Sequence, residues 1–375
     1  MLSALPVLPG LHIDAQHVIG DRRERPDRAW FDVIALPDGR TAMLVGNVVR
    51  PQTATGLGSA GVRTILAEMF PERCNLEAVL EGMNKTAYVE DAGHGTTLSV
   101  VVLDPRNGNV DYRLCDHAPP LVVTADGETR PLRAAGGADL PTGLPGAIER
   151  ECLAQDEVLV LHTGDISSVV RAPAAGPSAD TSDPARVMAR MPERAHRASA
   201  VRTEEICRAA AVGIGQSGTG EDLAVLAVQI KPPVPRLELT VPAVAESLAP
   251  AAQAVSDWLA GLRSSIEDGA SMALAMGEAV TNAVQHAFVG GRPGSVLVEC
   301  MLLADGVLVC SVSDNGRWLP AESSERGRVG RGLRMMARVC DRMLIHHKHS
   351  GTMVELRRRL HHPVIRSLPI GTDTN

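Results

Sequence analysis

The alternation of hydrophobic and polar residues in the first 230 positions predicts short strands joined in hairpins. Residues 30–36 and 41–45 flank Pro37-Asp38-Gly39-Arg40, a turn sequence typical of a β-hairpin. Strands are also predicted at 97–103, 110–115, 121–123, 157–161 and 223–230, and helices at 56–70, 75–88, 186–191 and 200–211. Hairpin strands with segregated helices indicate an α+β sandwich, not a parallel doubly wound sheet.

The pattern after residue 236 predicts a second layered domain. Residues 244–262 and 271–288 place apolar side chains at helical spacing, and Pro250 is expected to break or kink the first of these helices. Strands are predicted at 237–241, 295–303, 306–313, 342–347 and 352–357, with a helix at 333–339 after a glycine-rich loop. Helices that back a mixed or antiparallel sheet again form an α/β sandwich.

A proline-rich stretch marks the boundary between these two patterns. Residues 231–236 contain three prolines, which suit an extended, semi-rigid linker. We therefore expect a first domain at 1–230, a linker at 231–236, a second domain at 237–360 and a tail at 361–375.

Composition narrows the class of protein. The 375 residues suit two domains, and a net charge of −7 argues against a nucleic-acid partner. Seven cysteines without a CxxC pair indicate reduced thiols, not a disulfide frame or zinc site. No apolar run is long enough to span a membrane, and the first ten residues lack a basic n-region. We expect a cytoplasmic protein that binds neither nucleic acid nor membrane.

Two polar residues interrupt the apolar helix predicted at 271–288. Glu278 and Asn282 are four residues apart, so they share one helix face. An amide oxygen can ligate Mg²⁺ beside nucleotide phosphates, and a carboxylate one turn earlier can accept a proton from an attacking hydroxyl. Taken alone, such a pair is more often a solvated helix face than a site.

The downstream residues favour a site. Asp314 and Gly316 follow a predicted strand, where a carboxylate can accept a hydrogen bond from an adenine amino group. Gly351-Thr352 opens the last strand, where a hydroxyl can complete the same pocket. The phosphate-binding candidates precede the predicted helix at 333–339 and are Gly327, Gly330, Gly332 and Leu333. Glycines allow backbone N–H groups to approach phosphates, and a helix N-terminus favours anions.

These blocks, in this order, resemble the gyrase, heat-shock, histidine-kinase and MutL ATPase superfamily, and most of all its anti-sigma-factor serine kinase branch. GEAVTNAVQHAF resembles the N-box, SDNGRW the first glycine box and GRGLRMM the second. The resemblance covers residues 237–360 and implies a Bergerat-type fold that binds ATP and Mg²⁺. It makes Asn282 the Mg²⁺ ligand, Glu278 the base and Asp314 the adenine reader. Trp318 departs from the pattern, because the family has a second glycine there.

Short blocks in the first 230 residues resemble the metal-dependent type 2C (PPM) serine phosphatases, in particular the stage II sporulation protein E branch. The blocks are AWFDV, LPDGR, MLVGNV, HAPPL, PTGL, HTGD and GEDLAV. The resemblance covers residues 12–230 and implies an α-β-β-α sandwich. In that family, clustered carboxylates bind two Mn²⁺ or Mg²⁺ ions that activate a hydroxide.

Several of the family's carboxylate positions are altered in this chain. Ala29, Asn47 and Gly164 stand where the family has aspartate. The remaining metal-site candidates are Asp32, Asp165, Glu221 and Asp222. Because divalent ions of this kind require charged oxygen ligands, we favour a degenerate phosphatase site over an active one.

Three functions follow from the two resemblances. The first is a partner-switching regulator whose kinase-like domain phosphorylates a serine of an anti-sigma-factor antagonist, or binds a sigma factor. The second is an active Mn²⁺-dependent phosphatase acting on the same antagonist. The third is a scaffold that binds ATP without turnover. Relatives of the kinase branch often form homodimers, and the sequence leaves the oligomeric state open.

Overall fold

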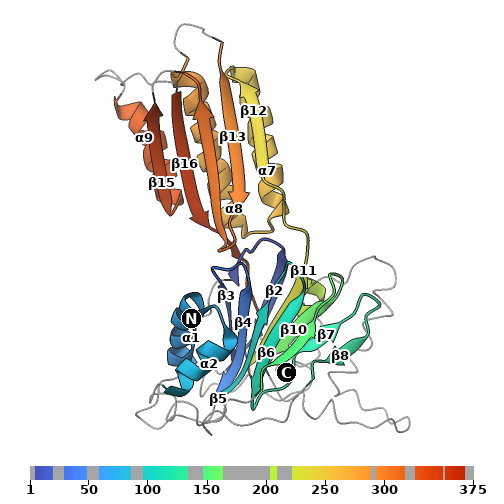
Figure 1. Cartoon of the computed structure of the whole chain (residues 1–375). Helices are drawn as coiled ribbons and strands as arrows, with labels where there is room; N and C mark the ends of the chain where they lie inside the picture. The colour runs from blue at the N-terminus through green and yellow to red at the C-terminus, as the bar shows by residue number, and fades with distance from the viewer. Residues whose placement is uncertain are drawn as a thin grey trace, which may run out of the picture. The chain divides into compact units, whose positions relative to one another are not determined.

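A computed structural model of the chain describes residues 5–19, 29–48, 59–85, 96–133, 147–163, 203–208, 222–288, 293–316, 326–348 and 351–367. The chain divides into two compact units, shown in Figure 1. The first unit comprises residues 1–5, 10–231 and 363–375, and the second comprises residues 6–9 and 232–362. The main boundary therefore lies at the proline-rich stretch, although each unit also includes a segment from the far end of the sequence.

The first unit is built on two β-sheets. The six-stranded sheet has the order β18-β2-β11-β10-β7-β8, and the five-stranded sheet has the order β3-β4-β5-β6-β9. The strands of the six-stranded sheet are β18 (Ile365–Ser367), β2 (Leu11–Val18), β11 (Leu223–Ile230), β10 (Val158–His162), β7 (Leu121–Val123) and β8 (Thr129–Pro131). Those of the five-stranded sheet are β3 (Ala29–Ala35), β4 (Thr41–Val48), β5 (Thr96–Leu103), β6 (Asn109–Cys115) and β9 (Glu149–Cys152).

Helices cover the outer faces of these sheets. Helices α1 (Ser59–Arg73) and α2 (Leu76–Lys85) pack through Leu66, Phe70 and Val79 on one face of the five-stranded sheet. Ile206 and Cys207, in the helical segment 203–208, pack on the six-stranded sheet. All eight residues of β11 are buried, as expected for a strand covered on both faces. The predicted α-β-β-α sandwich is confirmed.

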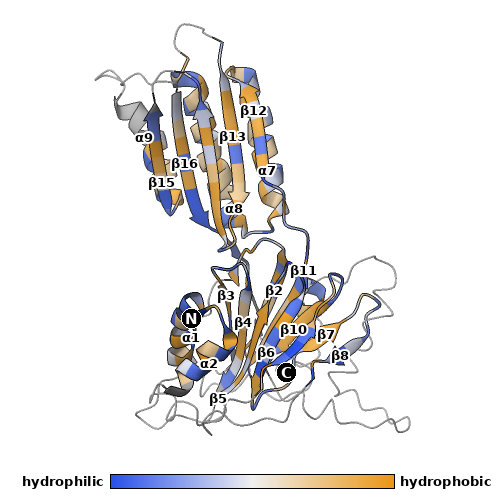
Figure 2. Cartoon of the chain, viewed as in Figure 1, coloured by the Kyte–Doolittle hydropathy of each residue, from blue (hydrophilic) through white to orange (hydrophobic). Residues whose placement is uncertain are grey.

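The second unit is a two-layer sandwich. Its antiparallel sheet has the order β12-β13-β14-β16-β15, and α7, α8 and α9 lie on one face of it (Figure 1). The strands are β12 (Leu237–Pro242), β13 (Ser295–Leu302), β14 (Val307–Asp314), β15 (Arg342–Lys348) and β16 (Gly351–Arg359). The helices are α7 (Leu248–Gly261), α8 (Ile266–His286) and α9 (Arg326–Val339). Apolar residues dominate β13, whereas β15 and β16 also contain polar stretches (Figure 2), and one apolar cluster joins the sheet to the helices.

Three helix boundaries differ from the prediction. Pro250 does not break its helix, because α7 begins at Leu248 after a 3₁₀ turn and a first-turn proline removes no helical hydrogen bond. Helix α8 begins five residues earlier than expected, at Ile266 against 271, because Ser265 caps it by accepting a hydrogen bond from the Asp268 N–H. Helix α9 begins at Arg326, so the glycine-rich segment expected as a loop forms its first turns.

Most strands agree with the predicted ranges, but several were not predicted. Strand β2 is the longest of these, and the short β8, β9 and β18 lie at or next to sheet edges. Strands β1 (Leu5–Pro6) and β17 (His361–His362) pair with each other. The residues expected to form a tail from 361 therefore include two strands. The helix expected at 186–191 lies outside the described residues.

The cysteines agree with the expectation of free thiols. All seven cysteines are free, and five of them are buried. Burial raises the pKa of the Cys115 and Cys340 thiols to about 11, so these thiols stay protonated near neutral pH. Within the described residues, no helix combines the length and apolar character needed to cross a membrane.

A buried histidine gives the first unit an expected pH dependence. Burial, together with the charge of the nearby His117, lowers the pKa of His162 to about 3. The unfolded chain, with a histidine pKa of about 6.5, takes up this proton first as the pH falls. The resulting loss of stability between pH 7.5 and pH 5 is about 2 kcal/mol. Urea unfolding of His162→Leu should show a weaker dependence over this range, and an unchanged pH slope would contradict the assignment.

Candidate functional site

The second half of helix α8 carries the two polar residues singled out from the sequence. Glu278 and Asn282 are both half-buried, while Ala275, Ala279 and Ala283 face the core. Glu278 reaches helix α9, because a Cβ atom placed on Gly332 would lie only 1.8 Å from Glu278 Oε1. The proposed base therefore lies directly against the second glycine box.

The end of strand β14 lies beside the end of helix α8. A Cβ atom on Gly316 would lie 2.1 Å from the carbonyl oxygen of Ala287, so only glycine fits at this contact. The turn is held by Asp314, whose Oδ1 accepts a hydrogen bond from the Gly316 N–H at 2.9 Å. The same oxygen accepts the Thr352 N–H at 3.3 Å. Asp314 thus links the first glycine box to the start of β16.

Gly351 makes this link possible. Its φ of +139° and a Cβ position 1.8 Å from the Asp314 carbonyl oxygen both require glycine. Thr352 follows it and is 6% exposed, and its Oγ1 is buried without a hydrogen-bond partner among the described residues. A buried hydroxyl without a partner costs free energy, which a bound polar ligand would recover.

The Asp314 carboxylate has a raised pKa. Burial raises its pKa above the ordinary value, although the hydrogen bonds from Gly316 and Thr352 and the charge of His347 act in the opposite direction. Asp314 pairs with Val296 across the sheet, and His347 pairs with Thr352. Because Val312 and Leu356 belong to the core, Asp314 and Thr352 both lie on the helix-covered face of the sheet.

The glycine-rich segment lies within helix α9. Gly327, Gly330 and Gly332 fall in its first seven residues, and Leu333 is half-buried. In a helix, the N–H groups of Gly330 and Gly332 bond to carbonyls one turn earlier, so this form does not offer them to phosphate. Each glycine weakens a helix by about 1 kcal/mol relative to alanine, so unwinding these turns has a low cost. Trp318 lies outside the described residues.

Two of the three altered carboxylate positions of the first unit, Ala29 and Asn47, lie side by side. Ala29 and Asn47 are direct cross-strand partners on β3 and β4. Ala29 is buried, and Asn47 Oδ1 is buried without a hydrogen-bond partner among the described residues. The residues that share this face of the strands, such as Phe31 and Val45, point away from the α1/α2 cluster.

Asp32 lies on the opposite face of the same strand. It is three residues from Ala29 and pairs with Leu44, a member of the helix-covered cluster. There, Asp32 Oδ2 lies 3.5 Å from Arg63 Nη2 of helix α1, and both side chains are largely buried. Arg63 also lies 5.5 Å from the centroid of the Trp30 ring. Asp32 therefore anchors α1 to the sheet and does not share a face with Asn47.

Of the other metal-site candidates, the structure describes only Asp222. Asp222 is half-buried just before β11, whereas Asp165 and Glu221 fall outside the described residues, as does Gly164. Within the part of the chain that the structure describes, no three His, Cys, Asp or Glu side chains gather as metal ligands. Of the four metal-site candidates, the described residues therefore include only Asp32 and Asp222.

Arg63 and Asp268 are two charged residues that the sequence did not single out. Arg63 gave no signal, because its partner lies 31 positions away on another element. Asp268 is three residues after the cap Ser265, a spacing typical of helix starts, and could have been recognised.

Comparison with known proteins agrees with this division of the chain. The family model of stage II sporulation protein E (SpoIIE) matches residues 37–231, and that of the histidine kinase-like ATPase domain matches residues 241–358. A crystal structure of the RsbU and RsbW domains of Rv1364c from Mycobacterium tuberculosis is 25% identical, with a TM-score of 0.79. The match covers 97% of this chain and 99% of that one.

A second solved structure contains the PP2C phosphatase domain and a regulatory fragment of SpoIIE from Bacillus subtilis. It is 11% identical with a TM-score of 0.45, over 60% of this chain and 65% of that one. The SpoIIE model alone spans more than half of the 375 residues. The chain therefore belongs to the stage II sporulation protein E family, with a histidine kinase-like ATPase domain fused after its phosphatase-type domain.

Proposed function

We propose that this protein is a partner-switching regulator whose second unit binds ATP–Mg²⁺ and phosphorylates a serine of an anti-sigma-factor antagonist. The observation that carries the proposal is the pair of polar side chains, Asp314 and Thr352, where β14 ends and β16 begins. Both side chains lie on the helix-covered face of the sheet. The pKa of Asp314 is raised by burial, and the Thr352 hydroxyl has no hydrogen-bond partner among the described residues. The RsbU and RsbW domains of the mycobacterial structure support a signalling role of this kind.

Each residue around α8 has a separate role in ATP binding or phosphate transfer. Asp314 accepts a hydrogen bond from the adenine amino group, and Thr352 completes the base pocket. Asn282 would hold the Mg²⁺ ion, which would neutralise phosphate charge. Glu278 accepts the proton of the serine hydroxyl as its oxygen attacks the γ-phosphorus and ADP leaves. The backbone at Gly327, Gly330 and Gly332 approaches the phosphates after the start of α9 unwinds.

Removal of the Thr352 hydroxyl tests the pocket. Thr352→Val keeps the side-chain shape, and we expect its loss of a hydrogen bond to weaken ATP binding by about 10-fold. Calorimetry of the full chain with ATP–Mg²⁺ measures this effect. No ATP binding by the wild-type chain would contradict the proposed function, and binding without phosphate transfer to an antagonist would favour the scaffold.

The first unit is a phosphatase-type domain that we propose has lost its two-ion centre. Ala29 and Asn47 pair across β3 and β4 at two positions where the resemblance implies aspartate, and Asp32 pairs with Arg63 on the other face. In this proposal the domain recognises the phosphorylated antagonist without cleaving it. The alternative of an active Mn²⁺-dependent phosphatase predicts hydrolysis of a phosphoserine peptide, and a variant of Asp222, not Asp32, is the appropriate test of it.

Restoring the two carboxylates tests the loss of the metal centre. The double variant Ala29→Asp/Asn47→Asp places two carboxylates on one face, where they should create Mn²⁺ binding that the wild type lacks. Calorimetry with Mn²⁺ detects the difference without relying on catalysis. Asp32→Asn is the control and should leave Mn²⁺ binding by the double variant unchanged. Equal Mn²⁺ affinity in wild type and double variant would refute the degenerate assignment.

A further inference from the structure

Each unit contains a short segment from the other end of the sequence. Residues 6–9 belong to the second unit, and residues 363–375 belong to the first. We call residues 6–9 and strand β18 the crossing segments. Neither lies within residues 37–231 or 241–358, the ranges matched by the two family models. Their role is therefore not described by the family assignment.

Residues 6–9 complete the core of the second unit. Val7 is 3% exposed and belongs to the same apolar cluster as Leu308 and Leu360. Its N–H donates a hydrogen bond to the carbonyl oxygen of Leu360 at 3.0 Å. The contact with the β13–β14 turn is close, because a Cβ atom on Gly306 would lie 2.8 Å from the Val7 carbonyl oxygen.

Strand β18 completes one edge of the six-stranded sheet in the first unit. It pairs in parallel with β2, with Ile365 opposite Gln16 and Ser367 opposite Val18. Only Pro363 and Val364 separate it from β17. The run from Gly351 to Ser367 therefore passes from the proposed nucleotide pocket to a sheet of the other unit within seventeen residues.

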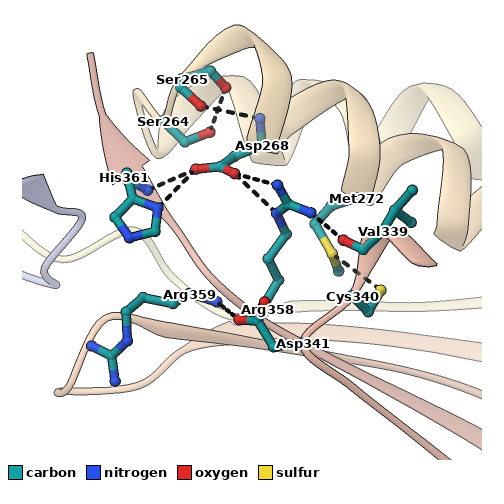
Figure 3. Close-up of polar contacts among 10 residues, drawn as sticks. All are labelled: Ser264, Ser265, Asp268, Met272, Val339, Cys340, Asp341, Arg358, Arg359 and His361. Atoms are coloured by element: carbon teal, nitrogen blue, oxygen red, sulfur yellow. Dashed lines mark hydrogen bonds and ion pairs between the residues drawn. The ribbon is translucent and has the colours of Figure 1, made fainter. Parts of the chain in front are cut away.

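A buried ionic cluster fixes the point where the chain leaves the second unit (Figure 3). Asp268 accepts the His361 N–H at 2.9 Å. The Ser265 N–H also donates to the His361 carbonyl oxygen at 2.7 Å. Arg358 donates to Asp268 Oδ1 through Nε at 2.9 Å and Nη2 at 2.7 Å. These bonds hold β17 to the first turn of α8, the helix that also carries Glu278 and Asn282.

We propose that the crossing segments couple the folding of the two units, so that neither unit has its full stability without the segment supplied by the other end of the sequence. Residues 6–9 fill the core of the second unit, and β18 supplies hydrogen bonds to the edge of the first. This coupling does not depend on nucleotide binding. It implies that a fragment starting at residue 237 has an incomplete core.

Hydrogen exchange of the full chain, followed peptide by peptide without nucleotide, tests the first segment. Val7→Asp should speed amide exchange in β14 and β16 by at least 10-fold, because it places a carboxylate in the core. Val244→Asp is the matched control, since Val244 is 46% exposed in the same unit. The milder Val7→Ala should give a smaller change in the same peptides. Equal exchange in all three variants would overturn the proposal.

Two shortened chains test the second segment. A chain that ends after His362 loses β18 and should exchange faster in β2 by at least 10-fold. A chain that ends after Ser367 keeps β18 and should match the full chain. Unchanged protection of β2 in the shorter chain would show that β18 does not stabilise the first unit, and the coupling would then be rejected.

Discussion

Alanine in place of Gly332 is expected to slow phosphate transfer by about 100-fold, because displacing a catalytic group by about 1 Å has an effect of this size. The added Cβ atom would lie 1.8 Å from Glu278 Oε1 and 2.6 Å from its Cδ. Either the carboxylate or helix α9 must move away. In both cases the distance between the proposed base and the glycine box changes.

Gly277 provides the matched control for this variant. It lies next to Glu278 on α8, and a Cβ atom there would meet no other atom within 4 Å. Gly277→Ala should therefore keep the transfer rate and raise stability by up to about 1 kcal/mol, as expected for alanine in a helix. Single-turnover transfer from labelled ATP to an antagonist protein measures both rates. If Gly332→Ala transfers phosphate as fast as Gly277→Ala, Glu278 is not the base at this contact.

Local sequence signals predicted the hairpins and the main helices. Strands β3 and β4 follow directly from the alternation on either side of Pro37-Asp38-Gly39-Arg40. The same alternation is present in β2, where Leu11, Ile13 and Ala15 are buried, but no turn signal marked it. The start of α9 could not be predicted from propensity, because its glycines favour a loop.

The sequence likewise predicted some features of the candidate sites and not others. The motifs of the proposed ATP site lie on elements that the fold brings together, so their order along the chain was informative. For the phosphatase-type site, the spacing of Ala29 and Asp32 already indicates that the two residues cannot belong to one metal site. Ala29 and Asp32 are three apart on one strand and must face opposite sides. The partners Arg63 and Arg358 could not be predicted, because each contact joins elements distant in sequence.

Methionine in place of Arg358 is expected to lower the free energy of unfolding of the second unit by about 3–5 kcal/mol, the usual cost of leaving a buried charge unpaired. The Asp268 and Arg358 side chains are 7% and 17% exposed. Burial alone would raise the pKa of Asp268, but the hydrogen bonds from Arg358 and His361 outweigh it and lower that pKa. Arg358 also bonds to the Val339 carbonyl oxygen at the end of α9 (Figure 3).

Arg357→Met separates this effect from the general loss of a surface charge. Arg357 is 39% exposed and pairs with Glu355 on its own strand, so its replacement should cost about 0–1 kcal/mol. The double variant Asp268→Asn/Arg358→Met removes both charges and should recover part of the loss, because no carboxylate then stays buried without its partner. Urea unfolding of the wild type, the two single variants and the double variant compares their free energies of unfolding. Hydrogen exchange in β16 serves as the readout for the second unit. Equal stability of the Arg357 and Arg358 variants would mean that the Asp268 pair contributes no more than a surface ion pair.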